Sequence, residues 1–190
     1  MILGVGKYQD YTTYLPECKE MVEKLSKMIH EILETSKLNG ITTEQPTTVD
    51  LPKLLKELCE PYQLIAAAHK KSFSLKLTEQ FTVTIPISSF SKAVSNVLAN
   101  AVAYTEAGKT ISVYMDERRL MIENECVPIP NSDIPRLFEP FYRPDFSRNC
   151  ESGGNGLGLY IVDTLLTSMN ISYSFAPMKD QQGMCFTIDL

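Results

Sequence analysis

Residues 88–105 read SSFSKAVSNVLANAVAYT, and their apolar positions recur at helical spacing. This pattern predicts a helix over residues 88–105, stopped by Gly108. Asn96 and Asn100 are four residues apart, so both carboxamides face one side of this helix, while the residues that face a core are Val97, Leu98, Ala101 and Val102. Carboxamides on an otherwise apolar helix are costly unless they are satisfied in the core or bind a ligand, and the segment alone leaves both open.

A glycine-rich segment, Gly153-Gly-Asn-Gly-Leu-Gly-Leu, opens a helix that we expect to run from Gly156 to about Met169. Glycines let backbone N–H groups approach an anion closely, and a helix start adds partial positive charge. The segment therefore predicts a phosphate cradle. It is neither a dinucleotide fingerprint nor a Walker loop, because no strand immediately precedes it and no Gly-Lys-Ser/Thr occurs.

A third segment lies between these two and reads Leu137-Phe-Glu-Pro-Phe-Tyr-Arg, continuing to Arg148. Its aromatic residues can anchor a mobile loop, while Arg143 and Arg148 offer positive charge to phosphates. Ordinary packing with solvated arginines is the alternative. Taken together and in this order, the three segments favour a phosphate-binding site over three separate packing features.

The rest of the chain predicts an α+β fold, because strands come in pairs and do not alternate strictly with helices. We expect a helix after Asp50, a short helix over residues 132–137, and a mixed sheet with helices on one face. The face of the first helix is predicted to carry Leu54, Leu55, Leu58, Tyr62 and Ile65. The strands are expected around Phe73, Leu75, Leu77, around Phe81, Val83, Ile85, and over residues 111–115, 120–122, 171–175 and 184–188.

The N-terminal stretch has a different pattern. Apolar residues alternate at spacings of three and four, at Leu15, Cys18, Val22, Leu25, Ile29 and Ile32. This predicts a bundle or coiled-coil helix that needs a partner helix and ends near Asn39 and Gly40. Polar residues 41–48 predict a linker or a short edge strand. We therefore expect two parts, residues 1–40 and 41–190.

Composition sets outer limits on the function. The 190 residues are 44% hydrophobic and carry a net charge of −5, which argues against nucleic acid binding and against disordered or disulfide-scaffold classes. No apolar run approaches a membrane span, and no signal peptide is evident. The five cysteines contain no C-x-x-C pair, which indicates reduced thiols, and neither they nor His30 and His69 have metal-ligand spacing.

The three segments resemble the N box, F box and second glycine box of sensor histidine kinases, over residues 45–190. Within that family, the run from Phe141 to Asn149 and the glycine segment look closest to vancomycin-resistance type sensors. The resemblance implies a Bergerat (GHKL) ATP-binding domain, a two-layer α/β sandwich. The N-terminal helix looks like the second helix of the dimerisation and phosphoacceptor hairpin, so residues 1–40 are expected to be a remnant of it.

The resemblance also implies roles for individual residues, with ATP and Mg²⁺ as cofactors. Asn100 would hold Mg²⁺ with the phosphates, assisted by Asn96. The other residues expected at the nucleotide are Tyr104, Asn124, Arg143, Arg148, Gly154, Gly156, Leu157 and Gly158. ATP-hydrolysing relatives carry a Glu as general base at the position of Asn96, and an amide cannot accept that proton, so phosphotransfer is favoured over hydrolysis.

The chain departs from the family pattern at several positions. Asn124 stands where an Asp accepts the adenine amino group, Cys126 and Pro128 replace glycines of the first glycine box, and Ala103 replaces a phosphate-binding Lys. No H-E-x-x-T-P phosphoacceptor sequence occurs, and His30 is interpreted as a bundle histidine. We therefore expect a catalytic fragment that binds ATP but cannot autophosphorylate.

The function implied is transfer of the ATP γ-phosphoryl group to a His on a helix absent from this chain, for relay to a response regulator. The full-length kinase is expected to be a homodimer in the cell membrane, with this domain in the cytoplasm. A catalytically silent nucleotide-binding or interaction module is the alternative. A GHKL ATPase ranks below both.

Overall fold

A computed structural model of the chain describes residues 14–19, 21–22, 25–26, 29, 44–144 and 155–190. The chain separates into two compact units, Met1–Gly40 and Ile41–Leu190. The described residues of the first unit are helical, as predicted, and their apolar side chains are 50–65% exposed at Leu15, Met21, Val22, Leu25 and Ile29. The predicted helix end near Asn39 and Gly40, together with Ile32 and His30, lies outside the described residues.

The second unit is an α+β domain built on a mixed sheet. Five strands lie in the order β2-β4-β5-β7-β6, with β2 parallel to β4 and the other neighbours antiparallel, while β1 and β3 form a separate antiparallel pair. In chain order the elements are β1 (Thr47–Asp50), α2 (Leu51–Ala68), β2 (Ser72–Lys76), β3 (Thr82–Ile85), α3 (Ile87–Tyr104), β4 (Thr110–Asp116), β5 (Arg119–Glu125), the 3-10 helix η1 (Ile134–Phe138), α4 (Gly158–Ser168), β6 (Tyr173–Pro177) and β7 (Gly183–Asp189).

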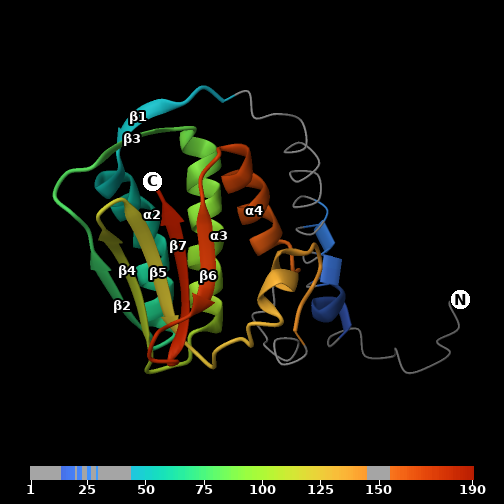
Figure 1. Cartoon of the computed structure of the whole chain (residues 1–190). Helices are drawn as coiled ribbons and strands as arrows, with labels where there is room; N and C mark the ends of the chain where they lie inside the picture. The colour runs from blue at the N-terminus through green and yellow to red at the C-terminus, as the bar shows by residue number, and fades with distance from the viewer. Residues whose placement is uncertain (1–13, 20, 23–24, 27–28, 30–43, 145–154) are drawn as a thin grey trace, which may run out of the picture. The chain divides into compact units, whose positions relative to one another are not determined.

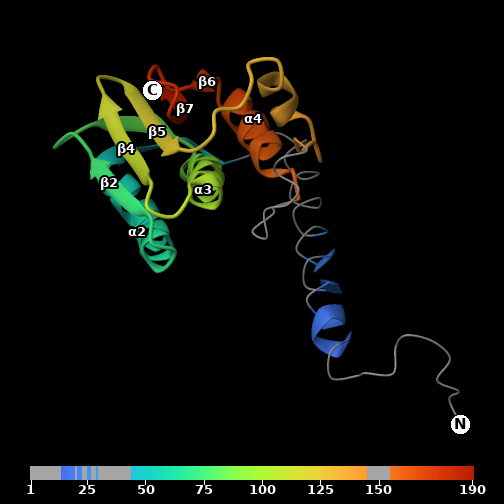
Figure 2. The same cartoon turned by 90° about the horizontal axis from the view of Figure 1, so that it is seen from below.

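Helices α2, α3 and α4 cover one face of the five-stranded sheet (Figures 1 and 2). Alternate strand residues point to opposite faces, so every second side chain of the central strands meets these helices. The fully buried ones include Ile111, Leu120, Ile122, Phe186 and Ile188. Helix α3 contacts β5, and its buried residues include Phe90, Val94 and Leu98. This two-layer arrangement confirms the predicted fold class.

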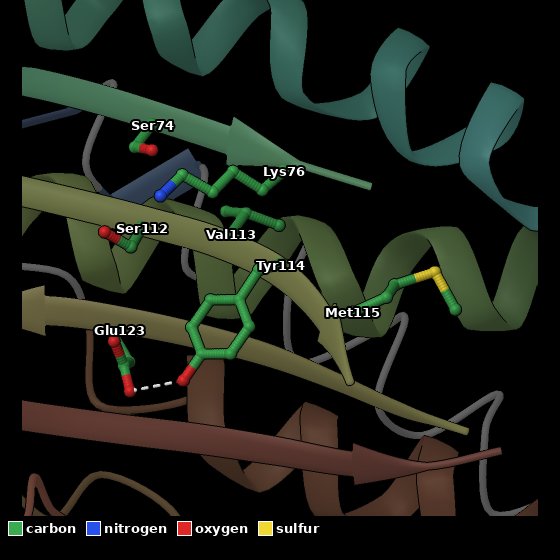
Figure 3. Close-up of a pocket in the computed structure, with 7 residues that line it drawn as sticks. All are labelled: Ser74, Lys76, Ser112, Val113, Tyr114, Met115 and Glu123. Carbon is green, nitrogen blue, oxygen red and sulfur yellow. Dashed lines mark hydrogen bonds between the residues drawn. The ribbon is translucent and has the colours of Figure 1, made fainter. Parts of the chain in front are cut away.

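The other face of the sheet is polar and bears a shallow hollow. The side chains that line it include Ser74, Lys76, Ser112, Tyr114 and Glu123 (Figure 3). The Tyr114 hydroxyl donates a 2.7 Å hydrogen bond to Glu123 Oε1, and burial, with this carboxylate, raises the pKa of the tyrosine. None of the predicted site residues lines this hollow.

Several element predictions need correction. The two strands predicted around Phe73 and Val83 exist as β2 and β3, but they belong to different sheets, since Phe73 pairs with Ile111 and Val83 with Val49. The short helix at residues 132–137 is the 3-10 helix η1. The fourth helix begins two residues later than predicted, at Gly158, because Gly156 has a positive φ of 74° that cannot continue a right-handed helix.

Helix α2 begins where expected. The Asp50 side chain accepts a 3.3 Å hydrogen bond from the Lys53 N–H, and Pro52 lies in the first turn. Its buried face differs from the predicted one, because Ile65 is 44% exposed and the buried residues are Leu51, Pro52, Leu55, Cys59 and Ala66. Among the described residues, no helix has the length and apolarity that spanning a membrane requires.

Candidate functional site

Helix α3 positions the two asparagines. Its buried face includes Phe90, Val97 and Leu98, which anchor it to the core, while Asn96 and Asn100 lie half-buried beside that face. The Asn96 amide nitrogen donates a 3.0 Å hydrogen bond to the carbonyl oxygen one turn earlier, at Lys92. The Asn96 amide nitrogen therefore has a hydrogen-bond partner within its own helix.

The start of α4 lies directly against these carboxamides. A Cβ atom at Gly158 would be 3.6 Å from both Asn100 Oδ1 and Asn100 Nδ2, and 3.9 Å from Asn96 Oδ1. Two segments more than fifty residues apart in sequence thus bring an amide-bearing helix face and a helix N-terminus together. A glycine at 158 leaves the space beside the amides open, and the α4 start supplies N–H groups and partial positive charge there.

Gly156 joins the glycine segment to the F-box segment. The Phe141 N–H donates a 3.0 Å hydrogen bond to the Gly156 carbonyl oxygen. A Cβ atom at Gly156 would be 2.9 Å from the Phe141 carbonyl carbon, and the φ of 74° also favours glycine. Phe141 itself has a positive φ of 66°. The residues on the two sides of the loop between the F-box and glycine segments are therefore joined to each other.

The F-box aromatics anchor the loop base in different ways. The Phe138 ring packs 5.5 Å from the Tyr173 ring, and the Tyr142 ring lies under the Arg136 guanidinium at 4.2 Å. The Phe141 ring is 55% exposed, so Phe141 is held by its backbone hydrogen bond to Gly156 and not by packing of its ring. Arg143 is half-buried at the start of the loop. The predicted Arg148 and Gly154 lie outside the described residues.

Leu157 contributes to the site differently from the sequence expectation. Its side chain is 2% exposed and belongs to the core, while its carbonyl oxygen accepts the 2.9 Å hydrogen bond from Ile161 that starts α4. Only its backbone can therefore face a ligand at this helix start.

Asn124 and Tyr104 lie on neighbouring elements. Asn124 ends the buried face of β5, which packs against α3, and it is 8% exposed. The β7 backbone approaches it so closely that a Cβ atom at Gly183 would be 2.1 Å from the Asn124 carbonyl oxygen. Tyr104 is the half-buried last residue of α3. Burial raises the pKa of the nearby Cys126 thiol, so this thiol stays neutral at pH 7.

The sequence analysis missed one residue that supports this site. Both carboxylate oxygens of Glu44 accept hydrogen bonds from the first turn of α3, at Ser88 and Ser89. No local pattern marks Glu44, because its partners lie 44 and 45 residues away.

The donor set fits magnesium only together with phosphate. Within the described ranges, no group of three or more His, Cys, Asp or Glu side chains could hold a metal ion. An amide oxygen such as Asn100 Oδ1 is a suitable Mg²⁺ ligand, but Mg²⁺ needs about six oxygen ligands, so phosphate oxygens and waters must supply most of them.

Comparisons with known proteins show which family the chain is similar to. Residues 86–190 match the family described as histidine kinase-, DNA gyrase B-, and HSP90-like ATPase. The chain is 33% identical over its full length to the sensor protein VanSB of Enterococcus faecalis and 28% identical over 98% of its length to the sensor histidine protein kinase HK06 of Streptococcus pneumoniae. It spans 43% and 41% of these relatives, about two fifths of their length.

Solved structures share the fold. The Acinetobacter baumannii histidine kinase AdeS superposes with a TM-score of 0.71 at 21% identity, covering 98% of this chain and 87% of AdeS. Full-length ShkA, solved in complex with AMPPNP, gives a TM-score of 0.75 at 20% identity, covering 93% of this chain and 38% of ShkA. At these identities the likeness establishes the architecture alone.

Proposed function

This chain belongs to the family of histidine kinase-, DNA gyrase B- and HSP90-like ATPases and contains a catalytic domain of the VanS-like sensor kinase type, and on that premise we propose that it binds MgATP and transfers its γ-phosphoryl group to a histidine. The observation that carries the proposal is the approach of Gly158 to Asn100 and Asn96. It brings a helix N-terminus, which favours anions, beside amide oxygens, which favour Mg²⁺.

The phosphates would lie at the start of α4, along the backbone from Gly156 to Gly158. An 11-residue helix presents its first N–H groups there, and the Leu157 backbone borders the same space. Arg143 precedes the loop and would add positive charge near the phosphates. Arg148 and Gly154 are the remaining residues proposed to bind the phosphates. Positioning and charge neutralisation are most of what phosphoryl transfer requires of a protein.

Asn100, assisted by Asn96, would hold Mg²⁺ through amide oxygen. A bound Mg²⁺ would supply positive charge that neutralises the phosphates. The chain's own contribution is to fix these amides on a helix whose adjacent face is buried in the core. At the other end of the nucleotide, the Asn124 side chain would accept a hydrogen bond from the adenine amino group, and Tyr104 would lie beside the nucleotide.

The α3 sequence supports transfer to a protein acceptor over hydrolysis. Hydrolysis needs a base that takes a proton from water. Helix α3 contains no Asp or Glu, and Asn96, which stands at the position of the base, donates its amide N–H to Lys92. A histidine acceptor needs no such base if its attacking nitrogen is already unprotonated.

The acceptor and the partners are proposed by analogy with the sensor kinases that the chain resembles. Residues 1–40 would be the second helix of the dimerisation hairpin, and a separate helix would carry the acceptor histidine. As given, the chain would not phosphorylate itself. The phosphoryl group would pass to a response regulator, and the full-length homodimer would lie in the cell membrane with this domain in the cytoplasm.

A silent nucleotide-binding module is the second candidate, favoured by Cys126 and Pro128 in place of glycines beside Asn124. An ATPase that hydrolyses ATP without transfer to an acceptor ranks third. One experiment separates them: the chain is mixed with a two-helix hairpin that bears an acceptor histidine, and with γ-labelled ATP. Label on the hairpin supports the kinase, binding without transfer supports the silent module, and steady phosphate release supports the ATPase.

Matched variants locate the activity. Asn100→Ala should abolish transfer, while Asn131→Ala, which removes an exposed carboxamide from a surface turn, should leave it unchanged. No binding of MgATP at millimolar concentration would overturn the kinase and ATPase assignments together.

A further inference from the structure

Helix α3 begins without a cap of its own. Its N-cap residue is Pro86, which has no side-chain acceptor, and no side chain of the flanking residues replaces it. The first turn of a helix leaves N–H groups that need acceptors. In α3 these include the N–H groups of Ser88 and Ser89, the second and third residues of the helix.

Glu44 supplies the missing acceptors from a distant part of the chain. Its Oε1 accepts a 2.7 Å hydrogen bond from the Ser88 N–H, and its Oε2 accepts 3.1 Å hydrogen bonds from the Ser89 N–H and the Ser89 hydroxyl. The negative charge also complements the positive end of the α3 dipole. One carboxylate therefore satisfies three donors at one helix start.

The placement of Glu44 follows from the β1–β3 pair. The two strands run antiparallel with Thr47 opposite Ile85, and Thr48 and Thr84 join their hydroxyls at 2.9 Å. Glu44 lies three residues before Thr47, and Ser88 lies three residues after Ile85, so the pairing of these strands brings Glu44 to the start of α3. The ribbon lies where α3 begins, since β3 leads directly into that helix (Figure 1). We call residues 44–50 and 82–86, which comprise β1, β3 and their flanking residues, the strap; it leads into the start of α3.

Through Glu44, the strap is hydrogen-bonded to the helix that carries the candidate metal-binding amides. Asn96 and Asn100 follow Ser89 by two and three turns, about 10 and 16 Å along a rigid helix axis. A Cβ atom at Gly158 would lie only 3.6–3.9 Å from their side chains, so a small axial or tilting movement of α3 would change how these amides face the start of α4. Resting on the proposed function, we propose that Glu44 is a positioning residue that fixes α3 so that Asn100 meets the Mg²⁺–phosphate end of ATP.

The test measures ATP dissociation constants by equilibrium dialysis in Mg²⁺ and in EDTA, with the full chain. The variants are Glu44→Ala, which removes all three hydrogen bonds, and Glu44→Gln, which keeps the shape and one acceptor oxygen. Glu60→Ala, at an exposed glutamate of α2, is the matched control. Circular dichroism spectra establish that each variant is folded.

For Glu44→Ala we expect the Mg²⁺-dependent gain in ATP affinity to fall about fivefold, the factor that corresponds to the ~1 kcal/mol of a typical helix cap. Glu44→Gln should fall between Glu44→Ala and the wild type, and Glu60→Ala should match the wild type. The constant in EDTA should not change, because adenine recognition does not depend on Mg²⁺. Equal constants for Glu44→Ala and wild type, or a parallel loss in Mg²⁺ and EDTA, would overturn the positioning role. A wild type that binds no ATP at all would remove the proposed function, and with it this role.

Discussion

Replacing Gly156 by alanine tests the closest backbone approach in the candidate site. Two penalties add. The φ of 74° places an L-residue in the left-handed region, which costs roughly 1–2 kcal/mol. The new Cβ atom would also lie 2.9–3.1 Å from the backbone carbonyl carbon, Cα and carbonyl oxygen of Phe141, and overpacking of this kind costs roughly 1–3 kcal/mol. The sum is about 2–5 kcal/mol of unfolding free energy.

Gly108→Ala is the matched control. Gly108 has nearly the same φ, 82°, but a Cβ atom there would meet nothing within 4 Å. This variant should therefore lose only the conformational part, roughly 1–2 kcal/mol. The difference between the two variants isolates the contact with Phe141.

Urea unfolding followed by circular dichroism provides the assay, with tyrosine fluorescence as a second probe since the chain has nine tyrosines and no tryptophan. The Gly156→Ala midpoint should lie well below that of Gly108→Ala at an unchanged m-value. Equal midpoints for the two variants would refute the close approach of Gly156 to Phe141, and with it the fixed loop base described above.

Three further predictions concern other glycines and one carboxylate. Gly158→Ala should keep or slightly raise thermal stability, because a Cβ at 3.6 Å from Asn100 is an ordinary contact and alanine favours helix, yet it should weaken MgATP binding in a dialysis titration. Gly183→Ala should destabilise by at least ~3 kcal/mol in urea, or fail to fold, because its Cβ would lie 2.1 Å from the Asn124 carbonyl oxygen; a midpoint like wild type would contradict this contact. Burial raises the pKa of Glu44, but the hydrogen bonds that the carboxylate accepts outweigh burial and lower the pKa overall. The stabilisation by Glu44 should therefore be complete above the ordinary carboxyl pKa and be lost as pH falls through the lowered pKa. The unfolding free energies of wild type and Glu44→Gln should then converge in acid.

The helix that carries the asparagines was predictable from the sequence to within one residue at each end. Its period of apolar residues is regular, and Gly108 marks the turn beyond its end. The partners of the strands were not predictable in the same way. The alternation of apolar residues around Phe73 and around Val83 predicts which side chains are buried. It does not predict that Phe73 pairs with Ile111 and Val83 with Val49.

The candidate site was predictable in part for a similar reason. Glycines and carboxamides are residue types whose spacing carries chemical information, so the N-box and glycine segments could be joined into one site before their contact was known. Glu44 has no such local signature, because a carboxylate in a polar stretch is ordinary until its partners, 44 and 45 residues away, are folded beside it. The positive φ of Phe141 likewise has no local signature, because phenylalanine does not favour the left-handed region.

The central claim is that Asn100 and Gly158 together form the Mg²⁺–phosphate end of one ATP site. A double-mutant cycle with Asn100→Ala, Gly158→Ala and the double variant tests it, with MgATP dissociation constants measured by titration calorimetry. Residues in contact at one site should be non-additive, so the double variant should bind only slightly more weakly than Asn100→Ala alone. Fully additive losses, or MgATP binding that neither substitution changes, would contradict the account.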